Sequence, residues 1–121
     1  MSDPDLFAGS QVTELTAEDF NIHGSSVQCL HPKCQHSDGW IMVYSPQCVH
    51  CHNKAPMWKK LASYTINDPQ GLIGVVNGEK PENQLLIESL KVEGFPTFFY
   101  IHNDGLMFES QSELDELWSV L

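Results

Sequence analysis

Cys48 and Cys51 are the residues whose type and spacing point most directly to chemistry. Two residues separate them in the segment VYSPQCVHCHNKAPMW (43–58), and His50 directly precedes the second cysteine. This spacing is typical of a redox-active dithiol or of one half of a metal site, and two unreactive core thiols are the remaining alternative. The thiolate is the form of cysteine that attacks disulfides and binds metals. Neighbouring groups that lower the pKa of a cysteine therefore make it more reactive at neutral pH.

A second pair, Cys29 and Cys34, precedes Cys48 by a short segment. The spacing of the four cysteines together is close to that of a four-cysteine zinc site. Histidines also occur around both pairs and are able to replace cysteine as zinc ligands: His31, His36, His50 and His52. A zinc-stabilised binding module without redox turnover is therefore the alternative to redox chemistry.

The composition of the chain limits which binding partners and which cellular compartment are expected. The chain has 121 residues with 6 Lys and Arg against 16 Asp and Glu, a formal net charge of −10. Such a charge argues against binding to nucleic acids or anionic membranes, and no apolar run approaches the about 20 residues of a membrane span. The acidic start MSDPDLFAGS does not resemble a signal peptide. We expect a cytoplasmic protein, with a removed leader as the alternative. Cys29 and Cys34 are then expected to form a reduced or reversibly oxidised surface pair. The alternatives for this pair are a second redox couple, a local structural disulfide, or half of a small site with His31 and His36.

The elements that must position the cysteines follow from hydrophobic patterning. GWIMVYS (39–45) predicts a buried strand, and residues 27–30 predict a short one before it. A helix is expected from about Cys48, bent at Pro56, because apolar residues recur at helical spacing on one face: Ala55, Trp58, Leu61 and Ala62.

The second half of the chain continues the alternation. GLIGVV (71–76) predicts a buried strand, residues 82–92 a helix, 97–103 and 106–109 a β-hairpin, and 114–121 a final helix. A buried strand–helix–strand unit implies parallel pairing, and the hairpin adds antiparallel strands. We expect a three-layer α/β/α sandwich with a central mixed sheet over residues 13–121, preceded by a flexible tail over 1–12.

Two motifs in this arrangement resemble the thioredoxin superfamily, and most closely a catalytic (a-type) domain of protein disulfide isomerase. One is the CxxC segment at a strand-to-helix junction, and the other is VEGFPTFFYIHNDG (92–105). The resemblance covers about residues 13–121 and implies a thioredoxin-like fold. Around the CxxC segment, the matching positions are Tyr44, Pro46, Cys48, His50, Cys51, Asn53, Ala55, Pro56 and Trp58.

The resemblance implies a protein thiol–disulfide oxidoreductase or disulfide isomerase. Its redox group is the Cys48–Cys51 disulfide, with no other cofactor and no metal. Cys48 at the helix N-terminus is the expected nucleophile, Cys51 the resolving thiol, and protonated His50 a nearby positive charge. The expected partners are protein thiols and disulfides as substrates, and a redox partner such as a reductase, a sulfhydryl oxidase or glutathione.

A substrate-binding lip is also implied by the resemblance. Pro96 is expected to follow a cis peptide bond, and the family places this loop against the cysteines. Phe95, Pro96 and Thr97 then form one side of the lip, whose facing rim is formed by Gln47 and Val49.

Four positions depart from the family pattern. Gln47 replaces a tryptophan, Val49 a glycine and Glu93 an arginine. Met42 stands where the family has a buried acid beneath the cysteines, which serves the resolving thiol as a proton acceptor. We therefore expect slower exchange than in a typical isomerase.

Overall fold

A five-stranded mixed sheet forms the centre of the computed structural model, which describes residues 6–7, 9–24, 26–34, 39–65, 72–102 and 105–109. Its strands, in the spatial order β1-β5-β4-β6-β7, are β1 (Thr13–Leu15), β5 (Leu72–Asn77), β4 (Gly39–Tyr44), β6 (Thr97–Ile101) and β7 (Met107–Glu109). The first three run parallel, and β6 and β7 are antiparallel to their neighbours.

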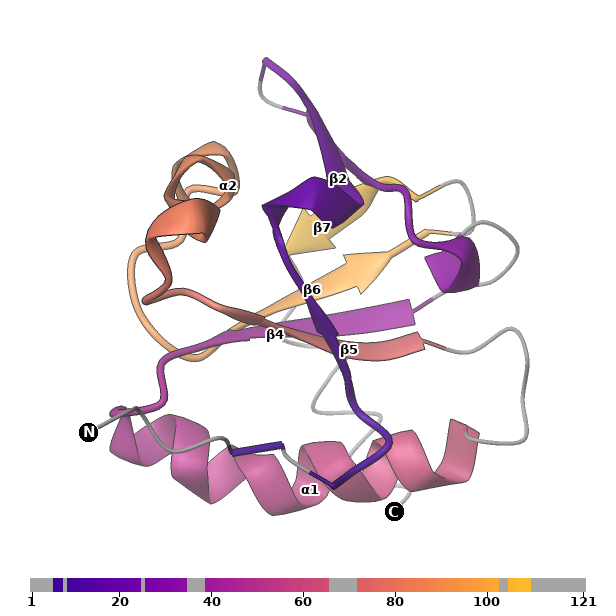
Figure 1. The fold of residues 1–121 in the computed structure, drawn as a ribbon, viewed down its shortest axis with the longest axis vertical. Helices are drawn as coiled ribbons and strands as arrows, with labels where there is room; N and C mark the ends of the chain where they lie inside the picture. The colour runs from indigo at the N-terminus through magenta and orange to yellow at the C-terminus, as the bar shows by residue number, and fades with distance from the viewer. Residues whose placement is uncertain are drawn as a thin grey trace.

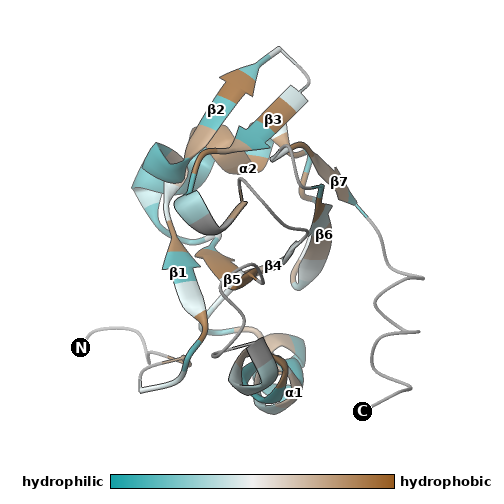
Figure 2. Cartoon of the chain, turned by 90° about the vertical axis from the view of Figure 1, so that its right-hand side faces the viewer, coloured by the Kyte–Doolittle hydropathy of each residue, from teal (hydrophilic) through white to brown (hydrophobic). Residues whose placement is uncertain are grey.

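One long helix, α1 (Val49–Thr65), covers one face of this sheet (Figure 1). The other face carries α2 (Gln84–Ser89) and a separate hairpin of β2 (Phe20–His23) and β3 (Ser26–Cys29) (Figure 2). This arrangement confirms the predicted three-layer α/β/α sandwich. None of the described helices is long and apolar enough to cross a bilayer.

Strand β4 divides the core into two clusters. Successive side chains of a strand point to opposite faces, so Ile41 and Val43 pack in the cluster under α2, and Met42 and Tyr44 in the cluster under α1. All four are buried, as expected for a strand covered on both faces. Because β4 ends directly before the CxxC segment, the sheet places both cysteines at its carboxyl edge.

The amino-terminal third differs from the prediction. The strand expected at 27–30 is β3, which pairs with β2 in the small hairpin and lies outside the central sheet. The first strand of the central sheet is β1, parallel to β5, and the sequence analysis did not identify it. Three residues are too few to show a strand period, and parallel pairing with a distant strand leaves no local signal.

Within the segment predicted as a flexible tail over 1–12, Phe7 packs against the core. This side chain is 5% exposed, and its ring packs edge-on against Tyr44 with 5.1 Å between ring centroids. The apolar run Leu-Phe-Ala (6–8) is too short to show a helix or strand period, so the burial of Phe7 could not be inferred from the pattern.

The remaining helices are shorter than predicted or outside the described part. The helix expected at 82–92 consists of a 3₁₀ turn (Pro81–Asn83) and the six-residue α2. The predicted helix at 114–121 and the turn at 103–104 lie outside the described residues.

Gly105 joins the small hairpin to the central sheet. Its φ is +91°, its carbonyl oxygen accepts a 2.7 Å hydrogen bond from the Cys29 N–H, and an added Cβ would lie 2.5 Å from the Cys29 oxygen. We expect Gly105→Ala to lower the free energy of unfolding by about 2 kcal/mol, because it adds left-handed strain and a backbone clash. Urea unfolding measures this loss. Gly94→Ala, where nothing lies within 4 Å, is the control and should change stability by less than about 1 kcal/mol.

Candidate active site

Cys48 occupies the N-cap position of α1. Its N–H donates to the Ser45 oxygen at 3.1 Å, and its own oxygen accepts the first helical bond from the His52 N–H at 3.1 Å. The N–H groups of the following turn have no partner within the helix and point toward the cap, where they favour an anion. Burial raises the pKa of Cys48. Hydrogen bonds from the Cys51 N–H and thiol and from the His50 N–H outweigh this and hold the pKa below its ordinary value.

Cys51 lies one turn further along α1 and faces the core. Its side chain is fully buried, in the same cluster as Met42, Trp58 and Phe98. Burial raises the pKa of Cys51 to about 12 and the neighbouring Cys48 adds to the rise, whereas a 3.4 Å hydrogen bond from the Ser45 N–H opposes it. Both cysteines are free thiols, so this is the dithiol state of the site.

The peptide bond between Phe95 and Pro96 is cis, as predicted. This loop lies directly against the nucleophile, because the Cys48 thiol donates to the Phe95 oxygen at 3.4 Å. Thr97 closes the loop by donating its hydroxyl hydrogen to the Gly94 oxygen at 2.7 Å. Gln47 and Val49, which flank Cys48 in the sequence, are both exposed, and Val49 is 69% exposed. The structure therefore brings the cysteines and the Pro96 loop together, and a facing rim formed by Gln47 and Val49 stays a prediction.

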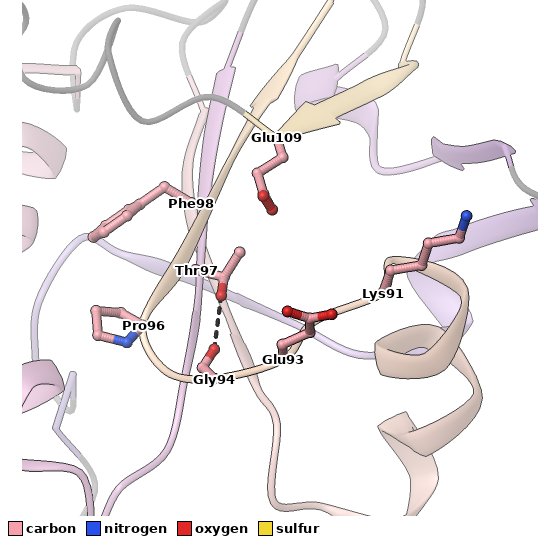
Figure 3. A pocket seen from close by; sticks show the side chains of 7 residues that line it. All are labelled: Lys91, Glu93, Gly94, Pro96, Thr97, Phe98 and Glu109. Carbon is pink, nitrogen blue, oxygen red and sulfur yellow. Dashed lines mark hydrogen bonds between the residues drawn. The ribbon is translucent and has the colours of Figure 1, made fainter.

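A cavity of about 380 Å³ extends from the Pro96 loop toward the end of β7 (Figure 3). Its lining includes the charged residues Lys91, Glu93 and Glu109. Glu93 was expected only as a departure from the family pattern, and Lys91 and Glu109 were not predicted to lie near the site. Glu109 is brought here by the pairing of β6 with β7, a contact that no local motif reveals.

The second cysteine pair forms a disulfide, Cys29–Cys34, with 6.1 Å between the Cα atoms. A 3₁₀ turn (Pro32–Cys34) brings the two residues together. The expectation of a surface pair is wrong, because both side chains are fully buried. They belong to the cluster under α2, on the other face of the sheet from Cys51.

This separation argues against the zinc alternative. A four-cysteine site needs all four sulfurs around one ion at about 2.3 Å, and here one pair is bonded and lies across the sheet from the other. Within the described part of the chain, no three His, Cys, Asp or Glu residues group as metal ligands.

The two histidines of the CxxC segment differ in their contacts. His50 is exposed in the first turn of α1, and a role for its side chain stays a prediction. His52 lies beside the site, with its Nε2 atom 2.6 Å from the Pro46 oxygen. From the sequence, His52 was expected only as a possible zinc ligand or as a possible proton acceptor in place of the missing acid at Met42. Its contact with Pro46 was not predicted, because a contact across a loop carries no spacing signal.

The unequal pKa values predict unequal reactivity of the two thiols. As pH rises, alkylation by iodoacetamide should accelerate at Cys48 with a midpoint below that of an ordinary cysteine, because the thiolate is the reactive form. Cys51 should stay unmodified through neutral pH, since its pKa is raised to about 12. Intact-mass measurement of reduced protein between about pH 5 and 10 should show a single early adduct. Equal rates at the two thiols would contradict the assignment.

Comparison with known proteins agrees with this geometry. The thioredoxin family model matches residues 12–120. The thioredoxin domain-containing protein 5 homolog of Drosophila melanogaster is 33% identical over 85 residues, which cover 68% of this chain and 20% of that protein. Protein disulfide isomerase-like 2-1 of Oryza sativa subsp. japonica is 28% identical over 134 aligned positions, with 94% and 36% covered. The chain thus spans a fifth to about a third of these relatives.

Solved structures share the fold. Thioredoxin f from spinach chloroplast (long form) superposes with a TM-score of 0.65 at 19% identity, and the alignment covers 95% of this chain and 88% of that one. The matching family model, which spans nearly the whole chain, and the dithiol at the start of α1 lead to the same conclusion: this chain belongs to the thioredoxin family.

Proposed function

We propose that this domain is a protein thiol–disulfide oxidoreductase in which Cys48 attacks and Cys51 resolves. The observation that carries the proposal is the asymmetry of the two thiols. Cys48 is partly exposed at a helix N-terminus with a lowered pKa, and Cys51 is fully buried beneath it with a raised pKa. One thiol is therefore ready to attack from solution, and the other reacts only within the complex.

The steps of the exchange cycle follow from these different roles of Cys48 and Cys51. The Cys48 thiolate attacks one sulfur of a substrate disulfide, and the second substrate sulfur leaves as a thiolate that takes a proton from water. Cys51 then loses its proton to water and attacks the Cys48 sulfur, which releases the first substrate sulfur. The domain becomes the Cys48–Cys51 disulfide, and the substrate gains two electrons. Run in reverse, the same steps oxidise a substrate dithiol.

The proposed substrate is an extended protein segment bound at the lip of Phe95, Pro96 and Thr97. Support comes from the contact between the Cys48 thiol and the Phe95 oxygen, which places main-chain acceptors of the loop beside the reacting sulfur. Val49 adds exposed apolar surface to the opposite rim, next to Gln47. Each turnover leaves the domain in the other redox state, so a reductase, a sulfhydryl oxidase or glutathione must restore it.

Titration of the full chain in glutathione redox buffers tests the function. Quenching with an alkylating agent and reading the intact mass counts the cysteines that change state. We expect one two-electron step at Cys48–Cys51, while the covered Cys29–Cys34 pair stays oxidised. A midpoint near about −180 mV would indicate an oxidant or isomerase, and one near about −270 mV a reductase.

The Cys51→Ser variant is the control for this titration and should lose the two-electron step. If wild-type protein shows no step until a chelator is added, the cysteines hold a metal and the proposal is wrong.

A further inference from the structure

The four-residue connection between β4 and α1 (45–48) lies against the buried thiol and is held by hydrogen bonds at each of its residues. Ser45 donates its N–H to the Cys51 sulfur at 3.4 Å and is itself buried. The other bonds are Gln47 N–H to the Ser45 hydroxyl at 3.3 Å, Cys48 N–H to the Ser45 oxygen at 3.1 Å, and His52 Nε2 to the Pro46 oxygen at 2.6 Å.

In the bond from His52, a side chain of the helix acts as the donor to a backbone oxygen of the loop. A carbonyl oxygen only accepts, so Nε2 carries a hydrogen and donates it. The backbone of His52 is tied to Cys48 by the first bond of α1. The imidazole therefore fixes the position of the Pro46 carbonyl relative to the first turn of the helix. Proline has a locked φ, which leaves one torsion fewer between this carbonyl and the Ser45 N–H.

The position of the Ser45 N–H matters most during the second step of the cycle. Negative charge develops on the Cys51 sulfur when this thiol ionises and attacks the mixed disulfide. Its neighbours Met42, Trp58 and Phe98 place apolar surface in the same cluster. In such surroundings a preorganised N–H donor stabilises an anion more strongly than in water.

We propose that His52 is a positioning residue for the resolving step: by bracing the Pro46 carbonyl, it holds the Ser45 N–H in place against the Cys51 sulfur. The role rests on the proposed function, because it concerns the second half of that cycle. It assigns to an imidazole and a backbone amide part of the anion stabilisation that Met42, which is apolar, does not provide.

Reaction of the reduced chain with 5,5′-dithiobis(2-nitrobenzoate) separates the two steps. Cys48 attack releases one thionitrobenzoate and leaves a second bound as a mixed disulfide, which Cys51 then displaces. Stopped-flow absorbance at pH 7 should show both releases. We expect His52→Leu to slow the second release about 3- to 10-fold, the value of one lost hydrogen bond, and to leave the first within about 2-fold.

Two further variants make the test specific to the donated hydrogen. His52→Gln keeps an N–H donor of similar reach and should restore the second release to within about 2-fold of wild type. Asn53→Leu, at the next exposed position of α1, should change neither release. An unchanged second release in His52→Leu, equal slowing in His52→Gln, or slowing of both releases together would overturn the proposal. A wild-type protein without a second release would instead overturn the proposed function itself.

Discussion

Replacing Cys48 by serine is expected to abolish disulfide exchange, with a loss of at least about 10³-fold in turnover. A serine hydroxyl stays protonated at neutral pH, and an oxygen nucleophile cannot form the mixed disulfide that the cycle requires. The measurement is glutathione-driven reduction of a disulfide-linked peptide. The fold should persist, because Cys48 is only partly buried at the start of α1.

Replacing Cys51 by serine separates the two halves of the cycle. Cys48 can still attack, so this variant should accumulate a mixed disulfide with a peptide substrate, which intact mass identifies as one adduct. A Cys48→Ser variant that keeps more than a few per cent of wild-type turnover, or a Cys51→Ser variant without adduct, would refute the assigned order of attack.

The largest loss of stability is expected at Trp58, the biggest fully buried side chain of α1. Its Nε1–H donates to the Gly74 oxygen at 2.9 Å, and its ring lies 5.4 Å from that of Phe98, centroid to centroid. Trp58→Ala should lower the free energy of unfolding by about 3 to 5 kcal/mol, because it leaves a cavity between α1 and the sheet. Urea unfolding monitored by circular dichroism measures it.

Two control variants separate packing from hydrogen bonding at this position. Trp58→Phe keeps an aromatic ring, but it leaves the Gly74 oxygen without this donor and should cost less than Trp58→Ala. Tyr64→Ala, on the exposed side of α1 with 60% of its residue surface exposed, should stay within about 0.5 kcal/mol of wild type. A Trp58→Ala loss no greater than that of Tyr64→Ala would show that α1 is not anchored through this side chain.

The central elements were predictable because their signals are local. GWIMVYS and GLIGVV are continuous apolar runs, and they form β4 and β5 within a residue or two of the expected bounds. Strand β1 was missed because it pairs with the distant β5. Strand β3 was misplaced because it pairs with β2, a short neighbouring strand that was also not predicted, and this hairpin lies outside the central sheet. A short strand is stabilised by its partner, and the partner is absent from its own sequence.

The residues of the candidate site also fall into those with a local sequence signal and those brought together only by folding. The CxxC segment and the Gly-Phe-Pro-Thr motif each lie within a few residues, so Cys48, Cys51 and Pro96 were predictable, and the structure brings them together. The His52–Pro46 contact and the approach of Glu109 to the Pro96 loop arise only after folding. Burial of the second pair was missed because the polar residues around Cys29 and Cys34 are typical of an exposed loop.

The placement of the two cysteine pairs on opposite faces of the sheet makes them independent reporters of redox conditions. Thiol exchange needs direct contact between sulfurs, and β4 separates the covered Cys29–Cys34 bond from Cys51. A bond buried on folding keeps the state it had when the core closed, whereas the dithiol at the helix start equilibrates with its surroundings. In protein isolated from cells, the oxidation state of Cys29–Cys34 should therefore reflect the environment in which the chain folded. The oxidation state of Cys48–Cys51 should reflect the environment from which the protein was collected.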